Sequence, residues 1–133
     1  MGEERKKLGE AELEVMQSLW RNSPLTAPRI LETLETRSWA MGTLITVLTR
    51  LTQKGFLACE KRPRASLYTP LVTEAEYLAG EGRSFLERLY GNSFRGMVAS
   101  LYGSNVIGPA ELEELQAFLD GLKAEGRNVN DAD

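Results

Sequence analysis

Apolar residues in the first part of the chain recur with the spacing of α-helices. In residues 10–21, 27–37 and 42–54 they fall three or four positions apart, which gives each segment one apolar side. Pro24 follows the first segment, and Pro28 lies in the first turn of the second, where a helix tolerates proline. We therefore expect three amphipathic helices in this part of the chain.

Two short strand-like runs follow the third helix. They cover residues 56–62 and 66–71, and Pro63-Arg64-Ala65 forms the turn between them. The pattern predicts a β-hairpin with basic residues at its tip. Three helices followed by a hairpin is the order of a winged helix-turn-helix, in which the third helix can enter a DNA major groove while the hairpin, or wing, lies beside it.

Three further amphipathic segments fill the second half of the chain. The run TEAE at residues 73–76 is a capping box that opens a helix reaching about Tyr90. An apolar stripe with helical spacing covers residues 94–101, and Pro109 opens a last helix with acidic residues in its first turn. From Glu125 onward the sequence is polar, and we expect a disordered tail.

These elements predict a mainly α fold with two domains and a tail. Residues 1–72 are expected to form an N-terminal winged helix-turn-helix domain, with three helices and a wing of two or three strands, that binds DNA. Residues 73–124 are expected to form a C-terminal helical dimerisation domain. Residues 125–133 are the tail.

The last three helices pose a problem of burial. A bundle of about 50 residues is too small to cover all of their apolar side chains. Pairing with a second copy of the chain would cover them, so we predict a homodimer. Packing onto the chain's own N-terminal domain is the alternative. The side chains expected at the dimer interface are Phe85, Leu89, Phe94, Met97, Val98, Leu101, Leu112, Leu115, Phe118 and Leu119.

The third helix has one apolar side and one side rich in hydroxyl groups. The apolar side should face the core, and the other side carries threonines and an arginine but no acidic residue. Thr and Arg side chains can contact base edges and phosphates. A merely solvated side is the alternative, although such surfaces usually carry better helix formers than threonine. The predicted DNA contacts are Thr43, Thr46, Thr49, Arg50, Gln53 and Lys54 from the helix, and Lys61, Arg62 and Arg64 from the hairpin.

The net charge of −3 conceals an uneven distribution. Residues 1–72 hold 11 Lys and Arg against 8 Asp and Glu, whereas residues 73–133 hold 5 against 11. Between residues 37 and 64 there are six basic side chains and a single acidic one, Glu60. A basic segment in an acidic chain is typical of a nucleic-acid contact region.

The composition argues against an enzyme. The chain has no histidine, which excludes His-based acid–base catalysis, the common nucleophile pairs and most zinc sites. Its one cysteine, Cys59, cannot form an internal disulfide and is interpreted as a small buried residue. We expect no enzymatic activity, no cofactor and no metal. No long apolar run and no secretory leader pattern is present, so a cytoplasmic location is predicted.

The sequence carries several distinctive stretches in a fixed order. The two strongest are LGEAELEVMQSLW at residues 8–20 and WAMGTLITVLTRLTQKGFL at residues 39–57. Others are TAPRILETL at 26–34, YTPLVTEAEYL at 68–78, SFLERLYGNS at 84–93 and AELEELQAFLD at 110–120. Together they resemble the penicillinase-repressor family, also called BlaI/MecI/CopY, from residue 8 to about residue 122.

The resemblance implies a homodimeric repressor that binds a palindromic operator in double-stranded DNA. The positions that match the family's DNA-reading motif are Thr43, Thr46 and Arg50. The resemblance assigns the two threonines to base edges, Arg50 to a phosphate or guanine, and the wing cations to phosphates. It also implies a sensor protease or another inducer as a partner that ends repression.

Three features depart from the family pattern: two missing cations, a different pair at the cleavage site and the lack of a C-terminal cysteine motif. Gly42 and Ile45 stand where the family motif usually has cations. The pair matching the Asn-Phe cleavage site of antibiotic-responsive members is Ser100-Leu101, and no cysteine follows Cys59, which argues against copper sensing through thiolates. A winged-helix protein–protein interaction module without sequence-specific DNA binding is the alternative function.

Overall fold

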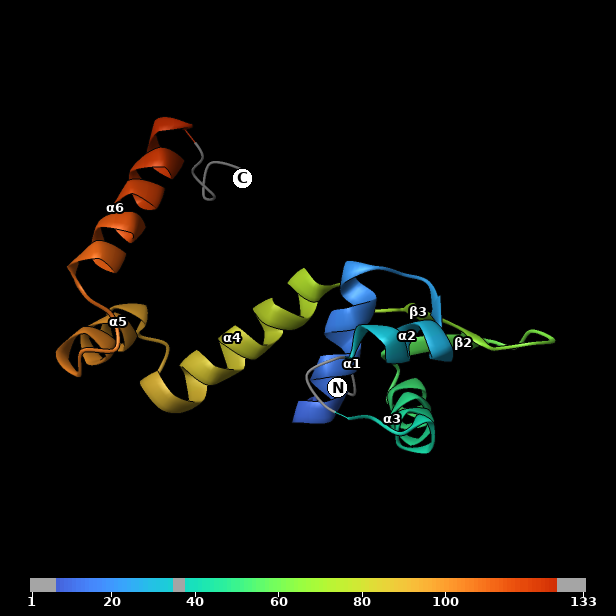
Figure 1. Cartoon of the computed structure of the whole chain (residues 1–133). Helices are drawn as coiled ribbons and strands as arrows, with labels where there is room; N and C mark the ends of the chain where they lie inside the picture. Colours follow the sequence, from blue (N-terminus) through green and yellow to red (C-terminus); the bar gives the residue numbers. More distant parts are fainter. Residues whose placement is uncertain (1–6, 35–37, 127–133) are drawn as a thin grey trace. The chain divides into compact units, whose positions relative to one another are not determined.

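The computed structural model describes residues 7–34 and 38–126 (Figure 1). By its contacts the chain divides into two compact units, Met1–Gly82 and Arg83–Asp133. The boundary lies inside α4 (Glu74–Tyr90), which continues through Gly80 and Gly82 as one helix. The predicted domain boundary after residue 72 coincides with the start of α4, whereas the compact unit extends to Gly82.

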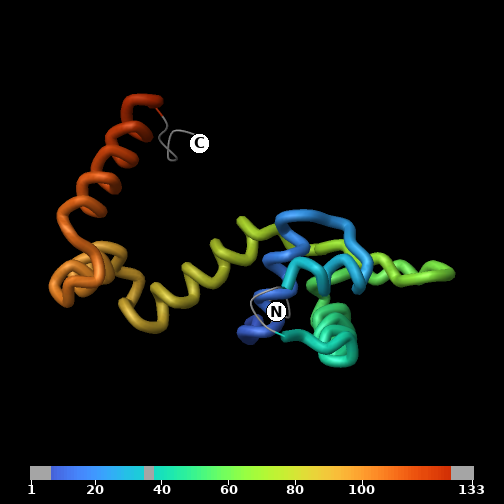
Figure 2. The backbone as a smooth tube through the Cα atoms, in the orientation of Figure 1, coloured from blue at the N-terminus to red at the C-terminus, as the bar shows by residue number. Residues whose placement is uncertain are grey.

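The first unit contains three helices and a small sheet. Its elements before α4 are α1 (Glu10–Arg21), β1 (Leu25–Thr26), α2 (Ala27–Thr33), α3 (Met41–Gln53), β2 (Leu57–Glu60) and β3 (Leu67–Pro70). The first predicted helix is confirmed at both ends, and the third is shifted by one residue. In Figure 2 the β2–β3 hairpin extends away from the three helices, as a wing should.

The second helix is shorter than the sequence pattern predicts. It ends at Thr33, because Leu34 leaves the helical region with φ −95° and ψ 70°. The Thr33 hydroxyl donates to the backbone oxygen of Ile30 at 2.7 Å, and it lies 2.6 Å from the hydroxyl of Ser18 on α1. Such local side-chain hydrogen bonds compete with the regular backbone bonds of a helix, and the helix ends here. The predicted residues 35–37 lie outside the described residues.

The wing has three strands in the order β1-β3-β2, all antiparallel. Leu25 pairs with Tyr68 in β1–β3, and Cys59 pairs with Tyr68 across β2–β3. The sequence left open two or three strands, and β1 is the third. It has only two residues, which is too short for alternation of apolar and polar positions to reveal it. Cys59 is half-buried rather than buried.

A single apolar core holds the first unit together. The predicted inner side of α3, formed by Leu44, Val47, Leu48 and Leu51, is fully or almost fully buried. Tyr77 of α4 packs against this core, with its ring 5.9 Å from the rings of both Trp20 and Phe56. The other buried apolar side chains are Leu8, Val15, Met16, Leu19, Ala27, Ile30, Leu34, Phe56, Leu57, Tyr68 and Val72.

The second unit contains the rest of α4 with α5 (Phe94–Gly103) and α6 (Pro109–Ala124). All three predicted C-terminal helices are confirmed. The predicted capping box forms, since the Glu76 N–H donates to Thr73 Oγ1 at 3.0 Å and the Thr73 N–H donates to Glu76 Oε1 at 2.9 Å. Neither α5 nor α6 has a buried residue. Within the described ranges, no helix is long and apolar enough to cross a membrane.

Candidate nucleic-acid interface

The exposed side of α3 is the candidate surface for nucleic acid. Because its four aliphatic residues fill the core, the opposite side of the helix must face solvent. That side is free of acidic residues, as the sequence MGTLITVLTRLTQ requires. The structure brings together on it the predicted contacts Thr43, Thr46, Thr49, Arg50 and Gln53, all of them exposed.

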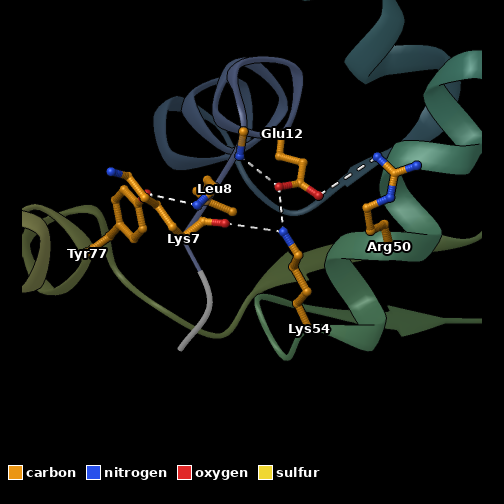
Figure 3. A network of polar contacts seen from close by, with 7 residues as sticks. Lys7, Leu8, Glu12, Arg50, Lys54 and Tyr77 are labelled. Carbon is orange, nitrogen blue, oxygen red and sulfur yellow. Dashed lines mark hydrogen bonds and ion pairs between the residues drawn. The ribbon is translucent and has the colours of Figure 1, made fainter. Parts of the chain in front are cut away.

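Arg50 reaches the edge of this surface beside a buried carboxylate. Its guanidinium nitrogen lies 3.9 Å from Glu12 Oε2, and its side chain is 53% exposed, whereas that of Glu12 is only 5% exposed (Figure 3). The long separation makes this a weak ion pair, and most of the guanidinium donors stay available to a ligand. Glu12 therefore orients Arg50, and the guanidinium group can still bind a ligand.

Lys54 is the closer partner of the same carboxylate. Its ammonium donates to Glu12 Oε1 at 2.7 Å and to the backbone oxygen of Lys7 at 3.3 Å (Figure 3). Its side chain is 19% exposed. The sequence predicted Lys54 as a DNA contact, but the structure directs its charge inward to α1. The main effect of Lys54 is to neutralise Glu12, which leaves Arg50 free to face outward.

Glu12 also caps its own helix. Its Oε1 accepts the N–H of Gly9 at 2.9 Å, which satisfies a backbone donor just before the first turn of α1. Burial alone would raise the pKa of Glu12. The hydrogen bonds from Lys54 and Gly9, with the charges of Lys54 and Arg50, outweigh burial and lower the pKa below its ordinary value of 4.5. Glu12 thus carries a negative charge at neutral pH and ties α1 to the C-terminal turn of α3.

The segment formed by residues 7–9 links this network to α4. The Leu8 N–H donates to the Tyr77 hydroxyl at 3.1 Å, and the Lys7 ammonium lies 3.7 Å from Glu81. Lys7 also accepts the hydrogen bond from Lys54, and Gly9 donates to Glu12. Lys7, Leu8 and Gly9 therefore bond in turn to Lys54 at the C-terminal end of α3, to α4 and to α1, and they tie the segment before α1 to three helices.

The wing carries cations of two kinds. Arg62 is paired with Glu60 at 3.3 Å, and both side chains are more than half exposed, so the pair is weak. Lys61 and Arg64 are exposed, and neither has an ion-pair partner among the described residues. All three predicted wing cations therefore lie at the surface, and two of them carry unneutralised charge.

Sequence reasoning missed Glu12 and Tyr77 as parts of this region. The signal for Glu12 was present, because a glutamate three residues after an N-cap position is the second half of a capping box. Its pairing with Lys54 spans 42 residues and cannot be read from local patterns. Tyr77 stands in an amphipathic helix, and nothing in its neighbours distinguishes it from a surface residue.

Three helices, a three-stranded antiparallel wing and an outward-facing third helix define the class of winged helix-turn-helix DNA-binding proteins. The particular family follows from sequence comparison. Residues 8–121 match the family model described as Penicillinase repressor, and the chain belongs to that family of DNA-binding transcriptional repressors. This confirms the resemblance and the expectation that the protein is a repressor and not an enzyme. It also disfavours the alternative of a protein–protein module.

Relatives of known name cover most of the chain. It is 32% identical over 118 residues to the penicillinase repressor of Bacillus licheniformis, covering 88% of this chain and 92% of that one. It is 28% identical over 115 residues to the methicillin resistance regulatory protein MecI of Staphylococcus aureus strain N315, covering 86% and 94%. The solution structure of Bacillus licheniformis BlaI, as a monomer with the blaP half-operator, is 35% identical. It covers 56% of this chain and 92% of that one, with a TM-score of 0.47.

Proposed function

We propose that the protein represses transcription by binding a palindromic operator as a homodimer, with α3 in the major groove and the wing against the DNA backbone. The observation that carries the proposal is the exposed side of α3. It is rich in hydroxyl groups, free of acidic residues and bordered by a half-exposed arginine. A helix of this kind suits the major groove, which admits an α-helix and presents hydrogen-bonding base edges.

Each half-site would be read by a few side chains. Thr43 and Thr46 are proposed to contact base edges, and Arg50 a phosphate or a guanine, with Thr49 and Gln53 beside them. In the free protein the Thr46 hydroxyl donates to the backbone oxygen of Gly42 at 3.1 Å, so its oxygen can still accept a hydrogen bond. The wing residues Lys61, Arg62 and Arg64 are proposed to contact phosphates. Lys54 has no direct part in this scheme because its charge is held by Glu12.

The C-terminal helices are proposed to join two copies. Large apolar side chains predicted for the interface remain exposed in the single chain: Leu89 is 56% exposed, Phe94 50% and Phe118 61%. Covering such side chains is the main driving force of association. Linking two half-site readers raises their joint affinity by two or more orders of magnitude. Loss of the dimer would therefore release the operator.

Because operator affinity depends on the dimer, an inducer could end repression by disrupting the dimer interface. A sensor protease or another inducer that disrupts α5 or α6 would reduce affinity without touching α3. Ser100 and Leu101, at the position of the family's cleavage pair, lie within α5, with Ser100 exposed and Leu101 half-buried. A protein whose target is operator DNA would act beside the chromosome, so we retain a cytoplasmic location as part of the proposal.

Selection of bound duplexes from a random pool tests the proposal directly. The full chain should enrich a palindrome with two half-sites about one helical turn, or a multiple of it, apart. With three or four phosphate contacts per half-site, log K should fall with log salt at a slope of roughly −5 to −7. If no duplex is enriched and the chain is not retained on DNA at low salt, the proposal is wrong.

A further inference from the structure

Two large apolar side chains are exposed on α3 itself. Met41 is 38% exposed and Ile45 is 40% exposed, and they stand one helical turn apart, where side chains are neighbours. In the described residues of the first unit, the other exposed large apolar side chains are Leu71 and Leu78. Two of these four side chains, Met41 and Ile45, therefore lie next to each other on the proposed reading helix.

These two residues form one border of the reading side. Successive residues of an α-helix are rotated by a constant angle, and this places Arg50 on the border near α1 and Ile45 on the opposite border. Thr46 and Thr49 lie between the two borders. Gly42, beside Met41, has no atom within 4 Å of the place where a side chain would begin, so the surface next to the apolar pair is open.

The chemistry of the pair restricts what it can contact in DNA. Neither side chain can donate to a phosphate or form a strong hydrogen bond with a base edge. The major groove offers one apolar group, the C5-methyl of thymine. Because Ile45 stands beside Thr49, one turn further along the same helix and on the reading side, a helix placed to read bases would also bring Met41 and Ile45 over the bases rather than out to solvent.

We propose that Met41 and Ile45 recognise thymine methyl groups in each operator half-site, which makes them specificity-determining residues. This inference rests on the proposed function. An apolar contact with thymine favours A·T pairs at defined positions, whereas a charge contact with a phosphate favours any DNA. Burying one methyl group is worth about a fourfold change in affinity, or roughly fifteenfold when both half-sites of a palindrome contribute.

The test uses the full chain and the duplex that it enriches most strongly from a random pool. Each thymine of a half-site is replaced in turn by deoxyuridine, which lacks only the methyl group, symmetrically in both halves. For the unchanged protein we expect about a fifteenfold loss at one or two positions. The variants Ile45→Ala and Met41→Ala should each bind the thymine and deoxyuridine duplexes with equal affinity at the position they contact.

Controls separate this inference from the function on which it rests. Leu78→Ala removes an exposed apolar side chain outside α3 and should keep the full sensitivity to deoxyuridine. Ile45→Lys should steepen the salt slope by about one per half-site while abolishing the methyl preference. Two results would overturn the inference: every deoxyuridine duplex binds as well as its parent, or Ile45→Ala and Met41→Ala keep the preference for thymine. In either case an enriched palindrome would still support the proposed repressor function. If no duplex is enriched, the proposed function itself fails.

Discussion

The two compact units of this chain differ in what they do with their apolar side chains. In the unit that ends at Gly82, the inward sides of α1, α2 and α3 close over a common core, and residues such as Leu48, Leu51 and Phe56 are completely buried. In α5 and α6 no residue is buried, although their sequences also carry apolar residues at helical spacing. Amphipathic periodicity thus predicts a helix equally well in both units, but it does not say whether the chain itself supplies the covering surface.

The difference assigns separate physical tasks to the two units. The first unit can form its fold from its own side chains, so its exposed surface is free to be polar and to meet DNA. The second unit exposes apolar side chains whose contact with water is unfavourable. Contact with a partner would remove them from water and so stabilise the association. Three substitutions test this division, from the largest expected effect to the smallest.

Phe118→Glu should have the largest effect. Phe118 is 61% exposed in the single chain, so a charge there costs little within the protomer, but it would be desolvated in the proposed dimer interface. We expect a monomer at micromolar concentration and a loss of at least about 100-fold in affinity for a full palindrome, because the linked second half-site is lost. Sedimentation velocity and DNA titration measure the two effects.

Ala117→Glu is the matched control for that substitution. Ala117 is also exposed in α6, and helical geometry places it on the opposite side of the helix from the apolar stripe. It should leave both the dimer and DNA affinity almost unchanged. A dimer that survives Phe118→Glu would contradict the proposed interface.

Arg50→Ala should weaken operator binding by about 1–3 kcal/mol and reduce the salt slope by about one per subunit. Since Arg50 is half-exposed and its ion pair with Glu12 is long, the free energy of unfolding should change by less than about 0.5 kcal/mol. Arg29→Ala removes an exposed arginine of α2 and serves as the control. Equal affinities for the wild-type protein and Arg50→Ala would exclude Arg50 from the interface.

Glu12→Gln should lower the free energy of unfolding by about 1–2 kcal/mol at neutral pH, since it removes the ion pairs with Lys54 and Arg50 but keeps an oxygen for the Gly9 N–H. The folded state lowers the pKa of Glu12, so its contribution is present above pH 4.5 and is lost as pH falls through the folded pKa. Urea unfolding across that range should show the two proteins converging in stability towards acid.

The control for this change is Glu32→Gln, which breaks the exposed Arg29–Glu32 pair of α2, whose side chains are both 69% exposed. It should cost no more than about 0.5 kcal/mol and show no comparable dependence on pH. If both substitutions had the same small effect, the network around Glu12 would not hold α1 and α3 together.

The sequence predicted the parts of this molecule that depend on local spacing. The inner side of α3, the capping box at Thr73 and Glu76, and the outward position of Arg50 all follow from residues a few positions apart. It could not predict the inward direction of Lys54, because Glu12 is distant in sequence. It also did not predict the strand β1, because two residues are too few to show an alternation of apolar and polar positions.

Tyr77 has a consequence for how the chain can be divided in the laboratory. A fragment that stops at Val72 would contain all three N-terminal helices and the wing, yet it would leave Trp20 and Phe56 without their aromatic neighbour and the Leu8 N–H without its acceptor. A fragment that stops at Gly82 retains these contacts. A fragment meant to keep the fold of the first unit should therefore include α4 as far as Gly82, and a protease cut within this part of α4 would remove contacts of the core as well as separate the two units.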